Sequence, residues 1–152
     1  MDGDFMKEYI KSKNLLTLYK EGYALDERGN EIENSDFNLY EANVNLSDSQ
    51  FTLSCATTAI DRNVRISQFI NNNWYSQIIV SLGSEMPIVF YKSSLTNRLV
   101  VSIINTTTDL MLNTGSTAAA YAPFWVEKAS KLYTNSEWTT NAGHKRTSGA
   151  WD

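Results

Sequence analysis

The stretch that decides the fold is Phe37-Asn38-Leu39-Tyr40-Glu41-Ala42-Asn43-Val44-Asn45-Leu46. Tyr40, Ala42, Val44 and Leu46 occupy alternate positions in it, with polar residues between them. Successive side chains of a β-strand point to opposite faces of the sheet, so this period of two predicts a strand with one buried face.

The same pattern continues as far as Asn113 and predicts further strands. We expect them over 51–55, 64–67, 74–82, 88–91, 99–104 and 110–112. Turn-forming residues separate the runs at 47–49, 61–63, 71–73, 83–84 and 93–97. No segment between the runs has the length and pattern of a crossover helix, so the sheet is expected to be antiparallel. Short strands at this spacing predict a sandwich or a partly closed barrel.

A helix is predicted before this β region, over residues 4–21. Asp4 is a suitable N-cap, and Gly22 would allow a left-handed stop after the last turn. Phe5, Tyr9 and Leu16 would share the apolar face. This amphipathic arm has two equally weighted interpretations: it packs on its own sheet, or it docks on a neighbouring subunit.

A second helix is predicted over roughly 118–133, with Pro123 near its start. The remaining residues, 134–152, are rich in Thr, Ser, Asn and Gly, and by composition they predict a disordered tail when isolated. Trp138 and Trp151 are its isolated large side chains. They would allow the tail to be pinned to its own domain or to a neighbour.

The expected fold class is therefore α+β, mainly antiparallel β, with an N-terminal helix and a C-terminal helix plus extended tail. The length of 152 residues fits a single domain over 1–152. Within it we expect a helical arm and turn over 1–34, a β core over 35–117, and a helix with a polar tail over 118–152.

The overall charge and hydropathy exclude several classes of protein. The formal net charge is −4, whereas a protein that binds double-stranded nucleic acid usually carries a basic stripe. No apolar run is long enough for a membrane-spanning helix. The acidic start, Met1 to Asp4, lacks the pattern of a signal peptide, so we expect cytoplasmic synthesis.

The sequence contains no recognisable catalytic or metal-binding constellation, and we expect no enzyme, cofactor or metal site. His144 is the only histidine and lies in the polar tail, a poor place to orient a catalytic base. Cys55 is the only cysteine, so neither a disulfide nor a Cys/His zinc site can form within one chain. It alternates with Leu53 and Phe51, which is typical of a core residue. An active site shared between subunits would remain possible.

Ser, Thr and Asn make up 45 of the 152 residues, and residues 35–117 hold only 10 of the 30 charged ones. A neutral polar surface of this kind suits many weak, salt-tolerant contacts. The leading hypothesis is therefore a structural protein that acts through protein–protein contacts in a homo-oligomer with other assembly subunits. A virion, such as a bacteriophage particle, is the favoured setting.

Asn71-Asn72-Asn73-Trp74-Tyr75 suggests a different function. Asparagines beside aromatic rings can bind sugars, so a carbohydrate-binding module with a glycan partner is one alternative. The alternation of the strand favours a different interpretation, which places Trp74 on the inward stripe of a core strand. A small inhibitor of a host enzyme is another alternative. The candidate interaction residues are Phe5, Tyr9, Leu16, Trp74, Tyr75, Trp138 and Trp151.

Overall fold

The structure, a computed structural model, describes residues 9–56, 62–81 and 86–127. The chain divides into two compact units: residues 11–124, and a terminal unit that combines 1–10 with 125–152. At the termini, β1 (Tyr9–Lys11) and β10 (Trp125–Glu127) form a two-stranded sheet. The division leaves the prediction of a single domain untested.

The larger unit contains eight of the strands. They are β2 (Thr17–Leu25), β3 (Glu31–Asn43), β4 (Gln50–Ala56), β5 (Asn63–Ile70), β6 (Asn73–Ser81), β7 (Ile88–Tyr91), β8 (Arg98–Ile104) and β9 (Thr108–Thr114). Strands β3 to β9 coincide with the runs of alternating or apolar residues in the sequence. The predicted runs thus lie on the later part of β3 and on β4 to β9, whereas β2 and the start of β3 lie in the region that was expected to be a helical arm and turn.

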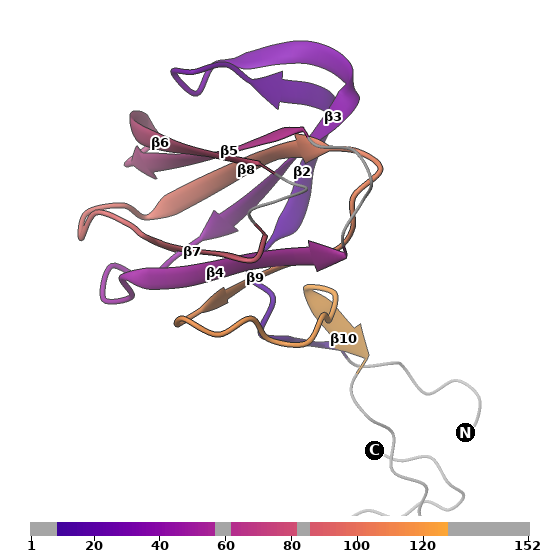
Figure 1. The fold of residues 1–152 in the computed structure, drawn as a ribbon. Coiled ribbons are helices and arrows are strands. Elements are labelled where there is room, and N and C mark those ends of the chain that lie inside the picture. The colour runs from indigo at the N-terminus through magenta and orange to yellow at the C-terminus, as the bar shows by residue number, and fades with distance from the viewer. Residues whose placement is uncertain (1–8, 57–61, 82–85, 128–152) are drawn as a thin grey trace, which may run out of the picture. The chain divides into compact units, whose positions relative to one another are not determined.

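These strands form two antiparallel sheets. One has the order β2-β3-β8-β5-β6 and the other the order β7-β4-β9, and they lie in separate layers (Figure 1). Neighbouring strands of both sheets run antiparallel, which confirms that prediction. The described strands form a sandwich-like arrangement rather than a closed barrel.

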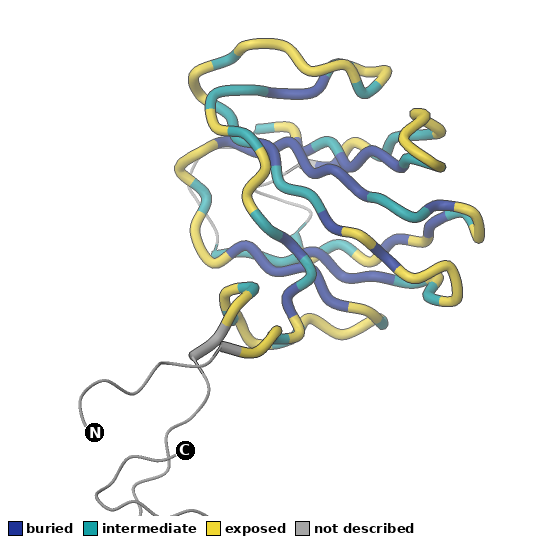
Figure 2. The backbone as a smooth tube through the Cα atoms, turned by 180° about the vertical axis from the view of Figure 1, so that it is seen from behind, coloured by how far each residue is buried: buried dark blue, intermediate teal, exposed yellow. Residues whose placement is uncertain are grey.

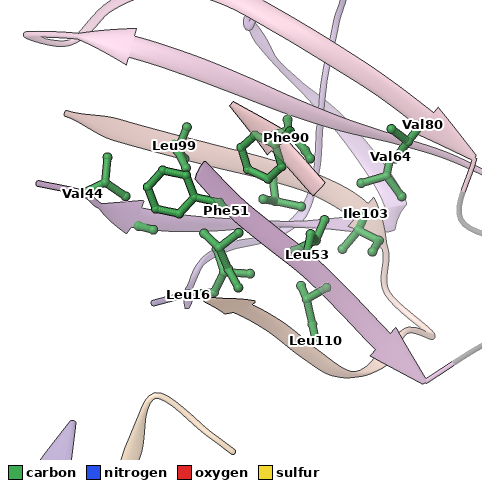
Figure 3. Packing of buried hydrophobic residues seen from close by; sticks show 14 of the residues in the cluster. Leu16, Val44, Phe51, Leu53, Val64, Val80, Phe90, Leu99, Ile103 and Leu110 are labelled. Carbon is green, nitrogen blue, oxygen red and sulfur yellow. The ribbon is translucent and has the colours of Figure 1, made fainter. Parts of the chain in front are cut away.

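The core lies between the two sheets. Phe51 and Leu53 of β4 enter it from the smaller sheet, and Val64 of β5 and Ile103 of β8 enter it from the larger one (Figure 3). Each of these four side chains is fully buried. Figure 2 shows the same division: buried residues follow the strands, and exposed residues gather at the turns. Burial of an aliphatic or aromatic side chain contributes about 1.5–3 kcal/mol, so this cluster dominates the stability of the unit.

The outer face of the larger sheet is also partly covered, because the tip of the β2–β3 hairpin folds over it (Figure 1). The Leu25 N–H at the end of β2 donates to Ser102 Oγ of β8 at 3.1 Å. Leu25, Leu39 and Val100 form a second, small buried cluster there. Strand β8 is therefore buried on both faces, which explains why its sequence is a continuous apolar run rather than an alternating one.

The predicted N-terminal helix over 4–21 is wrong for the residues that the structure describes. Residues 9–11 and 17–25 are strands β1 and β2, and residues 1–8 lie outside the described part of the chain. The helical spacing of the apolar residues is overridden by pairing with β3, from Thr17↔Glu41 to Leu25↔Glu31. Gly22, with φ +76°, lies at an irregularity in this pairing instead of ending a helix.

The predicted C-terminal helix is likewise absent from the described residues 118–127, which form a loop and β10. Pro123 lies in that loop, and its carbonyl accepts a hydrogen bond from Ser12 Oγ. Residues 128–152, including the rest of the predicted helix and the polar tail, lie outside the described part of the chain. In its described part the protein is mainly antiparallel β, and no helix occurs there.

Candidate functional site

Strand β6 ends the larger sheet, and no described strand pairs with its far edge. Its sequence, Asn73-Trp-Tyr-Ser-Gln-Ile-Ile-Val-Ser81, contains neither a charged residue nor a proline. Natural proteins usually protect an edge strand with a lysine, a proline, a bulge or a covering segment, because its unpaired N–H and C=O groups attract other strands. Apart from one bulge near its start, β6 has none of these devices in the described chain.

The other sheet edges are protected. At β9 the segment before β2 covers the strand: Leu15 N–H donates to the Leu112 carbonyl at 2.9 Å. The Asn14 side chain completes this cover, because its Nδ2 donates to the Leu110 carbonyl and its Oδ1 accepts from the Leu112 N–H. Asn14 is buried and thus takes the place of a strand neighbour.

The two remaining edges are unsuited to pairing for different reasons. Strand β7 is only four residues long. Strand β2 has irregular pairing at Tyr19 and Gly22, and it carries Lys20, which forms an ion pair with Glu31. The Lys20 ammonium also lies 4.9 Å from the ring centroid of Tyr23. Edge β6 is therefore the one long and uncharged edge among the described strands, and its pairing with β5 is regular from Ser76 to Ser81.

A bulge near the start of β6 decides how its aromatic residues point. Gln68 pairs with Ser76, but Phe69 pairs with Trp74, so Tyr75 is an extra residue in β6. The bulge moves Trp74 from the core face to the outer face, where Phe69 lies. The interpretation of Trp74 as a core residue is therefore wrong, and its side chain is 39% exposed.

The Trp74 side chain packs against the hairpin turn at 26–30. Its Nε1 donates to Ser67 Oγ at 3.3 Å, and its indole lies so close to Gly29 that a Cβ there would be 2.2 Å from Cδ1. Gln77 Nε2 also donates to Ser67 Oγ, and to the Asp26 carbonyl at 2.8 Å. The turn and β6 thus hold each other in place.

The turn itself is organised by Asp26. Hydrogen bonds from the backbone N–H groups of Asn30 and Arg28 and from the Asn30 side chain lower the pKa of its carboxyl, and the charge of Arg65 lowers it further. Gly29 has φ +77°, a conformation that glycine adopts without strain. Asp, Gly and Asn, which this turn contains, are residue types that turns prefer.

The most exposed large apolar residues of β6 are Tyr75 and Ile79. Their side chains are 53% and 51% exposed. Ile79 pairs with Arg65 on the outer face of the sheet, whereas its neighbours Ile78 and Val80 pair with Ile66 and Val64 on the core face. We had singled out Tyr75 in the sequence but missed Ile79; the signal was the absence of charge along the whole strand.

The structure describes two of the other candidate interaction residues, Leu16 and Tyr9. Leu16 is buried in the main core, so it cannot serve as a contact for a partner. Tyr9 begins β1 in the terminal strand pair. Phe5, Trp138 and Trp151 lie outside the described residues.

The described residues include no group of three His, Cys, Asp or Glu side chains that could hold a metal ion. They also contain no helix with the length and hydropathy needed to cross a bilayer. Comparison with known protein families, with curated proteins and with solved structures gave no match, so the function has to be argued from the geometry of this chain.

Proposed function

We propose that this protein is an assembly subunit that forms a homo-oligomer by pairing the free edge of β6 with β6 of a second copy. The observation that carries the proposal is the contrast between the edges: three are protected and β6 is not. An antiparallel pair of β6 strands would continue the five-stranded sheet into the partner and satisfy the unpaired backbone groups of both copies.

The composition of β6 supports a second copy as the partner. Because the strand has no charged residue, every antiparallel register of two β6 strands places neutral side chains opposite each other. Pairing would also bury part of Ile79 and Tyr75, whose side chains are about half exposed in the single chain. Self-pairing therefore creates no charge repulsion and removes apolar surface from water.

The proposed setting is a particle built from many subunits, of which a virion is the example that the neutral polar composition favours. Residues 35–117 hold few charges, so contacts between copies would depend little on salt.

The test is the mass of the protein in solution over a wide range of concentration, measured by sedimentation equilibrium. Wild type should associate as its concentration rises. Ile79→Lys should weaken the association by at least about tenfold, because it removes buried apolar surface from both copies and places a charge at the edge.

Leu95→Lys is the matched control, because Leu95 is an exposed leucine in the turn between β7 and β8. It should associate as wild type does. Amide hydrogen exchange should show protection of β6 that appears only in the oligomer. A wild type that stays monomeric throughout, equal effects of the two lysines, or new protection confined to another edge would each overturn the proposal.

A further inference from the structure

A pocket of about 300 Å³ lies between the folded hairpin tip and the outer face of the larger sheet. Asn34 and Ile32 line it from the hairpin side, with Phe37 further along β3. Arg65 and Asn63 line it from β5, and Arg62 immediately precedes that strand. The volume is at the lower end of the usual range for ligand pockets, which suits a molecule of monosaccharide size.

The charge of the pocket is opposite to that of the chain. Two of its described lining residues are arginines and none of those described is acidic, whereas the whole protein has a net charge of −4. Among the described residues, neither Arg62 nor Arg65 forms an ion pair. Two guanidinium groups that line one small pocket and form no ion pair with a described residue favour an anionic ligand.

Both arginines are held in position by contacts that leave hydrogen-bond donors available. The Arg62 guanidinium stacks over the Phe37 ring, with its Cζ 4.9 Å from the ring centroid. Arg65 donates from one Nη to Gln77 Oε1 at 2.7 Å. A guanidinium has five N–H donors, so each group retains several for a ligand.

The nearest carboxylates among the described residues do not line the pocket. Asp26 lies close enough to Arg65 for the charge of the arginine to act on it, but its oxygens accept hydrogen bonds from the turn. Glu33 and Asp36 of β3 are exposed and are not among the lining residues. The positive charge of the pocket therefore remains available.

We infer that this pocket binds a small anionic sugar, whose carboxylate or phosphate is held by Arg62 and Arg65 while its ring lies against Ile32 and Phe37. Asn34, Asn63 and the sheet residue Ser102 supply polar groups for the hydroxyls. This site is separate from the β6 edge: it uses the space under the hairpin, whereas assembly uses the backbone of β6.

The test is an NMR titration of the backbone amides with glucuronate, glucose 6-phosphate and glucose. The two anions share the oxyanion chemistry and differ in whether a carboxylate or a phosphate supplies it. At least one of them should shift the amides of Asn34, Asn63 and Ser102 in a saturable manner, and glucose should not. Which anion binds more tightly identifies the preferred group.

Two variants localise the site. Arg62→Gln should weaken binding of the preferred anion by about tenfold or more, because it removes charge-assisted hydrogen bonds. Arg28→Gln removes the same charge from an exposed position in the 26–30 turn, outside the pocket, and should leave binding within about twofold of wild type. No saturable shift with either anion, equal binding of glucose, or equal losses in the two variants would overturn the inference.

Discussion

Asn14→Ala should lower the free energy of unfolding by about 3–4 kcal/mol, since one buried side chain closes the β9 edge. Its Nδ2 donates to the carbonyls of Leu110 at 2.9 Å and Ala122 at 2.8 Å. Its Oδ1 accepts from the N–H groups of Leu16 and Leu112, each at 3.1 Å. Each intramolecular hydrogen bond contributes about 1 kcal/mol net, and water can replace only the partly buried bond to Ala122.

The assay is urea unfolding followed by tryptophan fluorescence, with a common slope for wild type and variant. Asn45→Ala is the matched control, because Asn45 is exposed and its side chain makes only one hydrogen bond to a described residue, a long one of 3.5 Å to Asp48. It should change the free energy of unfolding by less than about 0.5 kcal/mol. A loss below about 1 kcal/mol for Asn14→Ala would show that the edge is not closed as described.

Asn14→Asp separates hydrogen bonding from volume. The introduced carboxyl would face two carbonyl oxygens, which disfavour its charged form and raise its pKa in the folded state. The folded protein would then bind more protons than the unfolded one, so stability should fall as pH rises from about 4 towards the raised pKa. A variant that is equally destabilised at low and at neutral pH would contradict this mechanism.

Three further predictions test the turn, its acid and the free thiol. Gly29→Ala should destabilise the protein by more than Gly22→Ala does. Both glycines have positive φ, but only at Gly29 would an added Cβ collide with Trp74. Equal losses in the free energy of unfolding, measured in urea, would refute the contact. The pKa of Asp26 is lowered in the folded protein, so the stability that its carboxylate contributes is present above pH 3.8 and is lost as pH falls through the lower folded pKa. Asp26→Asn should therefore make the free energy of unfolding depend less on pH in acid. An unchanged dependence on pH would contradict this prediction. Burial raises the pKa of the Cys55 thiol, so alkylation by iodoacetamide at pH 8 should be several-fold slower in the folded protein than in urea, whereas equal rates would show an ordinary exposed thiol.

The β core could be predicted because its signals are local. Alternation in 37–46 and the apolar run at 99–104 depend only on which faces are buried, and the turn residues between strands prefer the same conformations in any context. Asn71 and Asn72 illustrate this: both adopt the left-handed conformation in the turn before β6, with φ of 50° and 69°.

The N-terminal helix was predicted wrongly because its signal was ambiguous. Phe5, Tyr9 and Leu16 have helical spacing. This spacing shows which residues are apolar, but it does not show which element buries them. In the structure Leu16 enters the sandwich core, and the residues after it gain backbone partners in β3. A helix over the same residues would forgo this pairing, so tertiary contacts override the local preference.

The sequence by itself determined the later part of β3 and the strands β4 to β9, because these follow from side-chain alternation and local backbone preference. Only the tertiary structure decided that a bulge turns Trp74 outwards, that Asn14 closes the β9 edge, and that Arg62 and Arg65 share one pocket. Each of these depends on the register between segments far apart in the chain. A shift of one residue reverses the face of every side chain that follows, and no local pattern records it.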